Sequence, residues 1–364
     1  MSFYAVRPEV LRLRPYVPGK PVAEVQREFG LVDVVKLASN ENPLGPSPLA
    51  LRAVQAAAAG AHIYPDPAAP ALRQALAIEA GLPPEWIFVG NGSDEILRLM
   101  ATSYLRAGDP VVLPDSSFPN YLAVSELMGA EVRVVPLAGE AMDLAEMARQ
   151  SAGARLIFLC RPNNPTGAVF PEDAFRRFMG EVPPDTLVLI DQAYHEFDSS
   201  PFDSLGLLRT FPNLVLTRTF SKAYGLAGMR IGYGLARPEI WAPLLTVREP
   251  FSVNTLAQAA ALAALQDDDH LAQTLRVVRE GKAFLMGLCD ELGLRYVESE
   301  ANFLFIDLGR PAQPVFQALL RQGVVVRPCG GFGRPTCLRV TAGRPAELER
   351  LAVALRGALA SPAD

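Results

Sequence analysis

The sequence of 364 residues has little of what builds a metal centre, a disulfide framework or a membrane span. Its three histidines and four cysteines are scattered, without CxxC or HExxH spacing. We therefore expect no metal site and four reduced thiols. The most apolar stretch, 256–265, is too short to cross a bilayer, and residues 1–16 have no signal-peptide core. These absences predict a cytoplasmic protein.

A long basic run is also missing, and the formal net charge is −5. This charge disfavours nucleic acid or an anionic membrane as the main partner. Half of the residues are apolar and 20% are charged, which is typical of a soluble globular protein. A chain of this length exceeds a single ordinary core, so we expect two packed units.

Short apolar runs alternate with helix-length segments from about residue 86 onward. This alternation predicts an α/β fold with a mostly parallel sheet covered by helices on both faces. The expected strands are 86–89, 111–113, 131–136, 155–160, 187–190, 214–218 and 231–235. Too few residues join the last two strands to form a full helix, so we expect that pair to be antiparallel.

The C-terminal hundred residues have a pattern of their own. After two long helices, 254–266 and 271–292, they alternate between strand and helix, which predicts a smaller α/β unit with one strand over 324–327. The N-terminal forty residues cannot bury their apolar positions alone and are expected to pack onto this unit. The predicted boundaries are an arm over 1–45, a large domain over 46–255 and a small domain over 256–364.

Polar side chains follow four of the predicted strands, at the end where ligands bind to open α/β sheets. These residues are Ser93, Asp94, Asn164, Asp191, Thr219, Ser221 and Lys222. Four separate segments thus deliver functional groups to one edge of the sheet, and this coincidence predicts a binding site there.

The turn 90–95 is rich in glycine and precedes a predicted helix from Ser93, its expected N-cap, to Leu105. It lacks the third glycine of a dinucleotide fingerprint and the Gly-Lys pair of a P-loop. The free N–H groups of such a helix start still suit a phosphate.

Two charged residues at strand ends indicate catalysis. Lys222 follows an apolar strand, and burial would lower the pKa of its amine and make it a nucleophile at neutral pH. Asp191 ends another apolar run and needs a cationic partner, for which a protonated pyridine nitrogen is suited. Arg230 adds a guanidinium that fits a phosphate.

The sequence resembles the fold-type I pyridoxal-phosphate aminotransferases of class I and II, and more narrowly the histidinol-phosphate aminotransferases. The segments that carry this resemblance are Leu37–Ser47, Tyr64–Asp66, Gly92–Glu95, Pro162–Gly167, Asp191–Tyr194, Thr219–Lys222 with Arg230, and Leu338–Thr341. They span nearly the whole chain. The resemblance implies a large domain with a seven-stranded sheet and pyridoxal 5'-phosphate as cofactor.

The resemblance also implies roles for individual residues around the cofactor ring. Lys222 binds the cofactor aldehyde covalently, and Asp191 holds the pyridine nitrogen protonated. Tyr194 and Asn164 hydrogen-bond the phenolic oxygen of the ring, and Phe118 stacks on its face. Lys222, Asp191 and Tyr194 are the implied catalytic residues.

Further residues are implied to hold phosphate and substrate. The implied phosphate ligands are Ser93, Asp94, Thr219, Ser221, Arg230 and, from a neighbouring subunit, Tyr64. The contribution of Tyr64 implies a homodimer. The implied substrate-binding residues are Arg339, Arg327, Tyr16 and Asn40. Two positions depart from the family pattern, which commonly has Glu at Gln192 and Tyr at Phe118.

The activity implied is ping-pong transfer of an amino group between histidinol phosphate and 2-oxoglutarate, in histidine biosynthesis. A threonine-phosphate decarboxylase and an aromatic or general amino-acid aminotransferase are alternatives on the same scaffold. A regulator without catalytic activity is disfavoured, because such proteins usually carry an added DNA-binding segment and this chain is expected to start too close to the catalytic domain to hold one.

Overall fold

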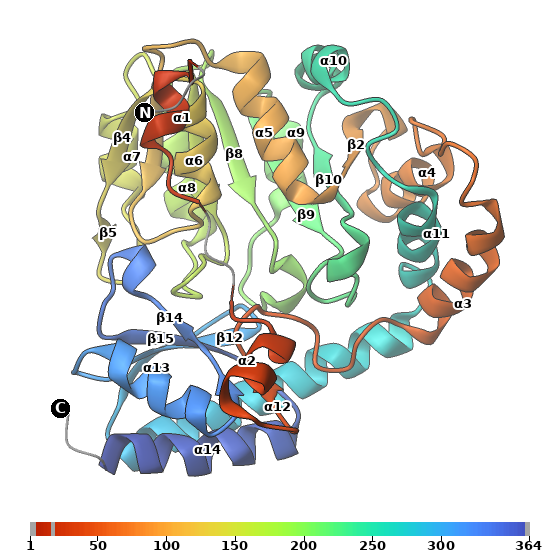
Figure 1. Cartoon of the computed structure of the whole chain (residues 1–364). Coiled ribbons are helices and arrows are strands. Elements are labelled where there is room, and N and C mark those ends of the chain that lie inside the picture. The colour runs from red at the N-terminus through yellow and green to blue at the C-terminus, as the bar shows by residue number, and fades with distance from the viewer. Residues whose placement is uncertain (1–4, 16–18, 361–364) are drawn as a thin grey trace.

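The computed structural model describes residues 5–15 and 19–360. Its described residues form a larger unit with a seven-stranded sheet and, beneath it in Figure 1, a smaller unit with a four-stranded sheet. In spatial order the strands of the larger sheet are β2 (Ile87–Gly90), β10 (Gly232–Leu235), β9 (Leu214–Thr219), β8 (Leu187–Asp191), β7 (Leu156–Cys160), β3 (Pro110–Pro114) and β4 (Glu131–Val135). Each predicted strand of this sheet is therefore confirmed, within one or two residues at its ends.

The central strands are buried on both faces because their sequences are continuous apolar runs, such as Leu-Ile-Phe-Leu-Cys in β7. Strands β4, β3, β7, β8 and β9 run parallel. Strand β10 runs antiparallel to both β9 and β2, which confirms the antiparallel pair predicted from the short connection. The mostly parallel sheet predicted from the sequence is thus confirmed.

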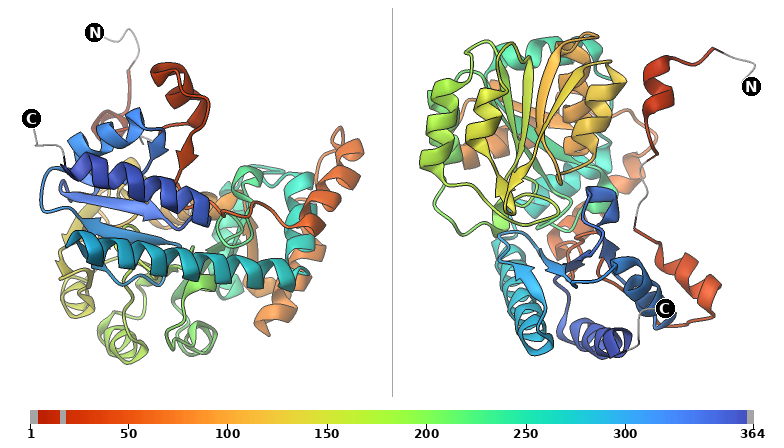
Figure 2. Two further views of the ribbon diagram at one scale, coloured as in Figure 1. Left: turned by 90° about the horizontal axis from the view of Figure 1, so that it is seen from below. Right: turned by 90° about the vertical axis from the view of Figure 1, so that its left-hand side faces the viewer.

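Helices cover both faces of the large sheet, as the right-hand view of Figure 2 shows. The helices before and within this unit are α1 (Pro8–Arg12), α3 (Pro48–Ala57), α4 (Pro70–Ala80), α5 (Gly92–Tyr104), α6 (Asn120–Leu127), α7 (Leu144–Arg149), α8 (Glu172–Glu181), α9 (Ser204–Thr210), α10 (Pro238–Val247) and α11 (Thr255–Ala264). A short hairpin, β5 (Leu137–Ala138) with β6 (Ala141–Met142), was not expected from the sequence.

The start of α5 differs from the prediction. The helix begins at Gly92, its N-cap is Asn91, and no side chain caps it. Ser93 therefore lies inside the first turn and is not the N-cap. Gly92 has a φ of +72°, which a side chain would strain, so the glycine itself allows the chain to turn directly from β2 into the helix.

The smaller sheet is antiparallel and has its own core. Its strands in spatial order are β11 (Arg295–Val297), β12 (Phe303–Asp307), β15 (Cys337–Thr341) and β14 (Arg327–Pro328). The 25-residue helix α12 (Asp268–Leu292), α13 (Ala312–Arg321) and α14 (Pro345–Ala360) bury Leu285, Leu319 and Leu355 in this core.

Part of the N-terminal segment, α2 (Val22–Phe29) with β1 (Val35–Lys36), packs on the smaller unit, as predicted. Strand β1 pairs in parallel with β13 (Val324–Val325), and Val25 of α2 packs against Val325. The prediction is wrong for α1, which contacts α6 of the larger unit, where Arg7 donates to the Leu127 carbonyl at 2.9 Å.

The expectation of one strand over 324–327 is wrong. Residues 324–325 form β13, which pairs with β1, whereas β14 pairs with β15. The expected strand is therefore two short strands in two different sheets. Where one domain ends and the next begins stays a prediction.

In the part of the chain that the structure describes, no helix has the length and apolarity needed to span a bilayer. All four cysteines are buried and free.

Candidate active site

A pocket lies where the carboxyl ends of the large-sheet strands face the small sheet. It is lined by Gly19, Ala38, Ser39, Asn40, Ser93, Asp94, Phe118, Cys160, Asn164, Asp191, Ala193, Tyr194, Thr219, Ser221, Lys222, Ala227, Arg230, Arg327 and Arg339. Among the described residues, the structure therefore brings every site residue predicted from the sequence into one pocket, except Tyr64.

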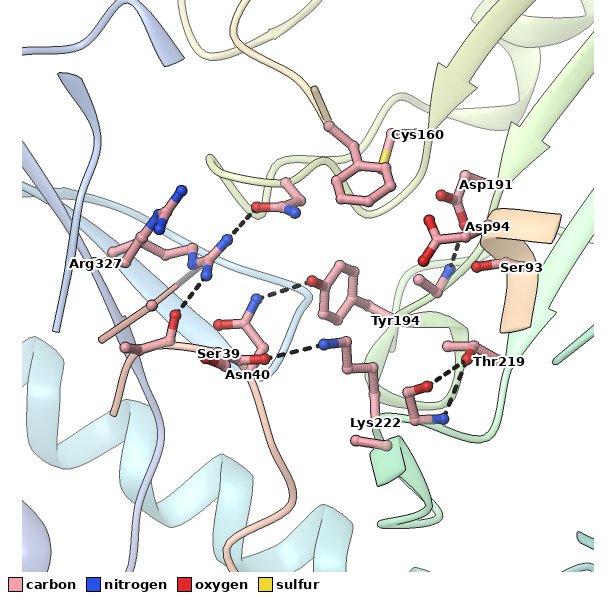
Figure 3. A pocket seen from close by; sticks show the side chains of 18 of the residues that line it. Ser39, Asn40, Ser93, Asp94, Cys160, Asp191, Tyr194, Thr219, Lys222 and Arg327 are labelled. Carbon is pink, nitrogen blue, oxygen red and sulfur yellow. Dashed lines mark hydrogen bonds between the residues drawn. The ribbon is translucent and has the colours of Figure 1, made fainter. Parts of the chain in front are cut away.

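Lys222 lies just beyond the end of β9, after the fully buried Phe220. Its Nζ donates a hydrogen bond to the Ser39 carbonyl at 3.0 Å and lies 5.9 Å from the centre of the Tyr194 ring. Figure 3 shows the amine extended into the pocket between these groups. Burial, helped by the charge of Arg339, lowers the pKa of the Lys222 amine to about 8, so a large fraction is neutral near pH 8.

Asp191 is the last residue of β8 and is buried. Its Oδ1 accepts from the Ala193 N–H at 3.1 Å and the Thr217 hydroxyl at 3.3 Å. Its Oδ2 accepts from the Tyr121 hydroxyl at 2.9 Å. Burial raises the pKa of Asp191 to about 6, although these donors oppose the shift. A cation placed against this carboxylate would be strongly favoured.

Tyr194 is held by the N-terminal segment. The Asn40 side-chain amide donates to the Tyr194 hydroxyl oxygen at 2.8 Å, and the Thr341 hydroxyl donates to Asn40 Oδ1 at 3.0 Å. The phenol oxygen thus receives a hydrogen bond while its own hydrogen stays available to a ligand. Asn40 was predicted to bind substrate. It lines the pocket, but the contact the structure gives its side-chain amide is to Tyr194.

Two arginines approach the pocket from the small sheet. Arg327 and Arg339 are register partners across β14 and β15. Arg339 donates to Asn164 Oδ1 at 2.5 Å and to the Ala38 carbonyl at 2.7 Å, and its guanidinium lies 5.3 Å from the centre of the Phe303 ring. Figure 3 shows Arg327 on the opposite side of the pocket from Asp191. This side of the pocket suits an anionic group.

The other end of the pocket is a second place for an anion, where the N-terminus of α5 meets the loop after β9. The Thr219 hydroxyl donates to Ser221 Oγ at 3.0 Å, and Arg230 forms an ion pair with Asp94 at 3.2 Å. A Cβ at Gly232 would lie 2.6 Å from the Ser93 backbone nitrogen, so this strand must approach the helix start closely. Hydroxyls, a guanidinium and a helix N-terminus together fit a phosphate.

Tyr64 and Gln192 are not among the residues that line the pocket. Tyr64 is 79% exposed and stacks on Phe251 with 4.6 Å between ring centres. Tyr16 lies outside the described residues. The side chain of Gln192 accepts from Arg218 Nε at 3.1 Å, so it is held by that guanidinium.

Sequence reasoning missed several pocket residues. They are Gly19, Ala38, Ser39, Cys160, Ala193 and Ala227. It also missed Tyr121 and Thr217, which contact Asp191 from behind the pocket wall. Ser39 contributes a backbone carbonyl, which no side-chain pattern could indicate. Tyr121 lies in α6, 70 residues from Asp191, and no local pattern indicated their contact.

The donor set fits pyridoxal phosphate. An amine of lowered pKa, a buried carboxylate in need of a cation and a phosphate-sized anion cradle lie in one pocket, and the cofactor carries an aldehyde, a pyridine nitrogen and a phosphate.

Comparisons with known proteins agree with this geometry. Residues 32–355 match the family model for class I and II aminotransferases. The chain is 58% identical over 356 residues to a histidinol-phosphate aminotransferase of Symbiobacterium thermophilum, covering 98% of this chain and 99% of that one. It is 46% identical to one of Moorella thermoacetica, over 97% of this chain and 93% of that one.

A solved structure is similar over almost the whole fold. The histidinol-phosphate aminotransferase of Sinorhizobium meliloti in complex with pyridoxal 5'-phosphate has a TM-score of 0.91 and 30% sequence identity, covering 98% of each chain. Together with the matching family model and the pocket, these similarities establish that the chain belongs to the class I and II aminotransferases.

Proposed function

We propose that this chain transfers an amino group between histidinol phosphate and 2-oxoglutarate, with pyridoxal phosphate as cofactor, in histidine biosynthesis. The observation that carries the proposal is the single pocket in which Lys222 and Asp191 face an arginine pair. Relatives named histidinol-phosphate aminotransferase, at 58% and 46% identity over nearly the whole chain, support the choice of substrate.

The chain's own groups divide the work of holding the cofactor. The Lys222 amine binds its aldehyde, Asp191 pairs with its ring nitrogen, and Phe118 packs on its ring face. Tyr194 and Asn164 hydrogen-bond its phenolic oxygen. The proposed phosphate ligands are Ser93, Asp94, Thr219, Ser221 and Arg230. When bound, the cofactor supplies an electron sink that makes the substrate's α-hydrogen acidic.

Lys222 is the proposed general base and acid once substrate has displaced it. Its Nζ would take the proton from the substrate α-carbon as a base and then donate it as an acid, and the pKa of about 8 suits both roles near neutral pH. The Tyr194 hydroxyl, oriented by Asn40, supplies a hydrogen bond that favours negative charge on the phenolic oxygen.

Arg327 and Arg339 are the proposed substrate ligands. Histidinol phosphate carries a phosphate and 2-oxoglutarate carries two carboxylates. Both substrates therefore present an anionic group. Two guanidinium groups from adjacent strands can bind either group with paired hydrogen bonds. Tyr16 and Asn40 complete the proposed substrate set.

We also propose that the protein is a cytoplasmic homodimer. The exposed Tyr64, stacked on Phe251, is then placed to reach the cofactor phosphate of a second copy. The domain division proposed from the sequence, with boundaries near residues 45 and 255, places the pocket between the two larger domains.

The test begins with the purified protein loaded with pyridoxal phosphate. L-Glutamate alone should convert the visible absorption of the bound cofactor to that of its amine form, and kcat/KM should be highest for histidinol phosphate among histidinol phosphate, phenylalanine and aspartate. Release of CO2 from threonine phosphate without a spectral response to glutamate would instead indicate the decarboxylase. Preference for phenylalanine or aspartate would indicate a general aminotransferase.

Lys222→Ala should abolish turnover and covalent capture of the cofactor. The matched control is Lys282→Ala, because burial also lowers the pKa of Lys282 and its amine likewise donates to a backbone carbonyl, that of Ser299, away from the pocket. Wild-type transamination by Lys222→Ala would exclude the proposed mechanism.

A further inference from the structure

Tyr121 contacts the catalytic acid but does not line the pocket. It lies in the first turn of α6 and is 1% exposed. Its hydroxyl is 2.9 Å from Asp191 Oδ2, across 70 residues of sequence. Asp191 itself lines the pocket that the cofactor would enter, as Figure 3 shows. A buried phenol is thus fixed directly behind the group assigned to the ring nitrogen.

The Tyr121 ring cannot turn away from this contact. It stacks on Phe158 at 5.1 Å between ring centres with only 7° between the planes. The ring also meets Phe118 edge to face at 5.6 Å. Contacts with both rings restrict the rotation of the Tyr121 side chain and hold its hydroxyl against Asp191.

The proton of this hydrogen bond belongs to the phenol. Burial and the nearby carboxylate hold the pKa of Tyr121 well above its ordinary value, so the phenol donates and Asp191 accepts. The other oxygen, Oδ1, receives the Ala193 N–H and the Thr217 hydroxyl. Tyr121 is the donor that the structure places on Oδ2. Each such bond stabilises the ionised carboxylate against the cost of its burial.

The other titratable groups around Asp191 do not replace this donor. Asp94, from α5, carries negative charge and disfavours ionisation of Asp191. The Cys160 thiol, from β7, has its pKa raised by burial and by Asp191, and it donates to the Pro162 carbonyl at 3.3 Å. The two hydroxyls, of Tyr121 and Thr217, and one backbone N–H therefore hold the carboxylate ionised.

We propose that Tyr121 is a positioning residue for this reaction: its phenol donates to Asp191 Oδ2, keeps that carboxylate ionised and oriented, and thereby keeps the proton on the cofactor's ring nitrogen. The inference rests on the function proposed above. Without the phenol, the carboxylate binds a proton more tightly, so the proton shared with the ring nitrogen moves toward Asp191. The ring then loses its positive charge and withdraws electrons less strongly from the substrate.

Tyr121→Phe tests the proposal because it removes the hydroxyl and retains the ring packing. Loaded with pyridoxal phosphate labelled with ¹⁵N in its ring, the variant should show a ring-nitrogen signal shifted toward that of the unprotonated base at neutral pH. We expect kcat to fall roughly tenfold or more, as for loss of a hydrogen bond to a charged group. The KM for glutamate should stay within about twofold, because Tyr121 does not line the pocket.

The control is Tyr104→Phe, which also removes a hydrogen-bonded tyrosine hydroxyl, that of a half-buried residue. The Tyr104 hydroxyl donates to the Ile240 carbonyl at 2.8 Å, away from the pocket. This variant should leave the ¹⁵N signal, the cofactor dissociation constant and kcat unchanged. If Tyr121→Phe lowers only the thermal midpoint, as a merely structural hydroxyl would, and leaves the ¹⁵N signal at its wild-type position, the proposal is overturned.

A double-mutant cycle separates a role through Asp191 from any other. In the Asp191→Asn background, adding Tyr121→Phe should change kcat and cofactor affinity little, because the carboxylate through which Tyr121 acts is already absent. A full additional loss would overturn the proposal. Failure of the wild-type protein to bind pyridoxal phosphate would instead reject the proposed function, so the two failures are distinguishable.

Discussion

Burial shifts the pKa values of Lys222 and Asp191 in opposite directions within one pocket. The Lys222 amine becomes easier to deprotonate, with a pKa of about 8, and the Asp191 carboxyl becomes harder to deprotonate, with a pKa of about 6. Both shifts have the same cause, because an apolar environment disfavours charge of either sign. The residues themselves were predictable from their place at the ends of apolar strands. The donors that oppose the shift at Asp191 were not.

At this scale, the pH dependence of cofactor capture is a direct prediction. The protonated amine is not a nucleophile, so covalent capture of pyridoxal phosphate by the cofactor-free protein should speed up as pH rises and level off above about 8, not above the ordinary lysine value of 10.5. Stopped-flow absorbance between pH 6 and 10 measures the rate. A rate that is still rising steeply near pH 10 would contradict the lowered pKa.

At the scale of elements, the loops after parallel strands bring distant segments together. The antiparallel small sheet supplies Arg327 and Arg339, the residues proposed to bind the anionic group of the substrate. Asp191 ends β8, and Ser221 follows the adjacent strand β9. The sequence pattern predicted both positions at strand ends. The pairing of Arg327 with Arg339 was not predictable from periodicity. It depends on the division of 324–328 between two sheets, which sets the register of β14 against β15.

The arginine pair predicts a difference between the two half-reactions. Arg339 is fixed by Asn164 and the Ala38 carbonyl, so we expect it to serve both substrates. Arg327→Gln should therefore raise KM for histidinol phosphate about tenfold or more, as for one charge-assisted contact, and raise KM for glutamate less. Steady-state kinetics with each substrate varied in turn check this. Equal increases for both substrates would reject a phosphate-specific role.

The turn after Lys222 provides a stability prediction for the same elements. Gly225 has a φ of +68°, and a Cβ there would lie 2.2 Å from the Gly45 carbonyl oxygen of the N-terminal segment. Gly225→Ala should destabilise the protein by more than about 1 kcal/mol and weaken cofactor binding by displacing the loop that carries Lys222. Denaturant unfolding measures the loss.

Gly228→Ala is the matched control for that loop. Nothing lies within 4 Å of a Cβ built at Gly228, and its φ is not in the left-handed region. It should unfold at nearly the wild-type denaturant concentration. Equal stability of the Gly225 and Gly228 variants would mean that the turn and the N-terminal segment can separate without cost.

At the scale of the whole molecule, the pocket is formed where the two sheets and the N-terminal segment meet. Asn40 links Tyr194 of the large unit to Thr341 of the small sheet, and Lys222 donates to Ser39. Of the predicted site residues that the structure describes, Tyr64 alone is not among the pocket residues, and it is exposed. This placement is what a residue contributed to a second subunit requires.

Mixed oligomers test the contribution of Tyr64. Tyr64→Ala should weaken cofactor binding, although the residue is absent from the pocket of its own chain. Coexpression of Tyr64→Ala chains with Lys222→Ala chains should give activity above either parent, because one site of each mixed dimer then has both residues intact. Val353→Ala, on the exposed face of α14, is the control and should bind the cofactor normally. Unchanged activity of the mixture would reject the shared site.

The sequence by itself determined the expected chemistry and the positions along the chain of the strands that carry it. Apolar runs long enough for buried strands ended in Asp191 and led to Lys222, and this local pattern sufficed to predict one ligand edge. Tertiary structure alone decided which groups support them. The contacts of Tyr121 with Asp191 and of Asn40 with Tyr194 span 70 and 154 residues, and such contacts depend on packing that no local periodicity encodes.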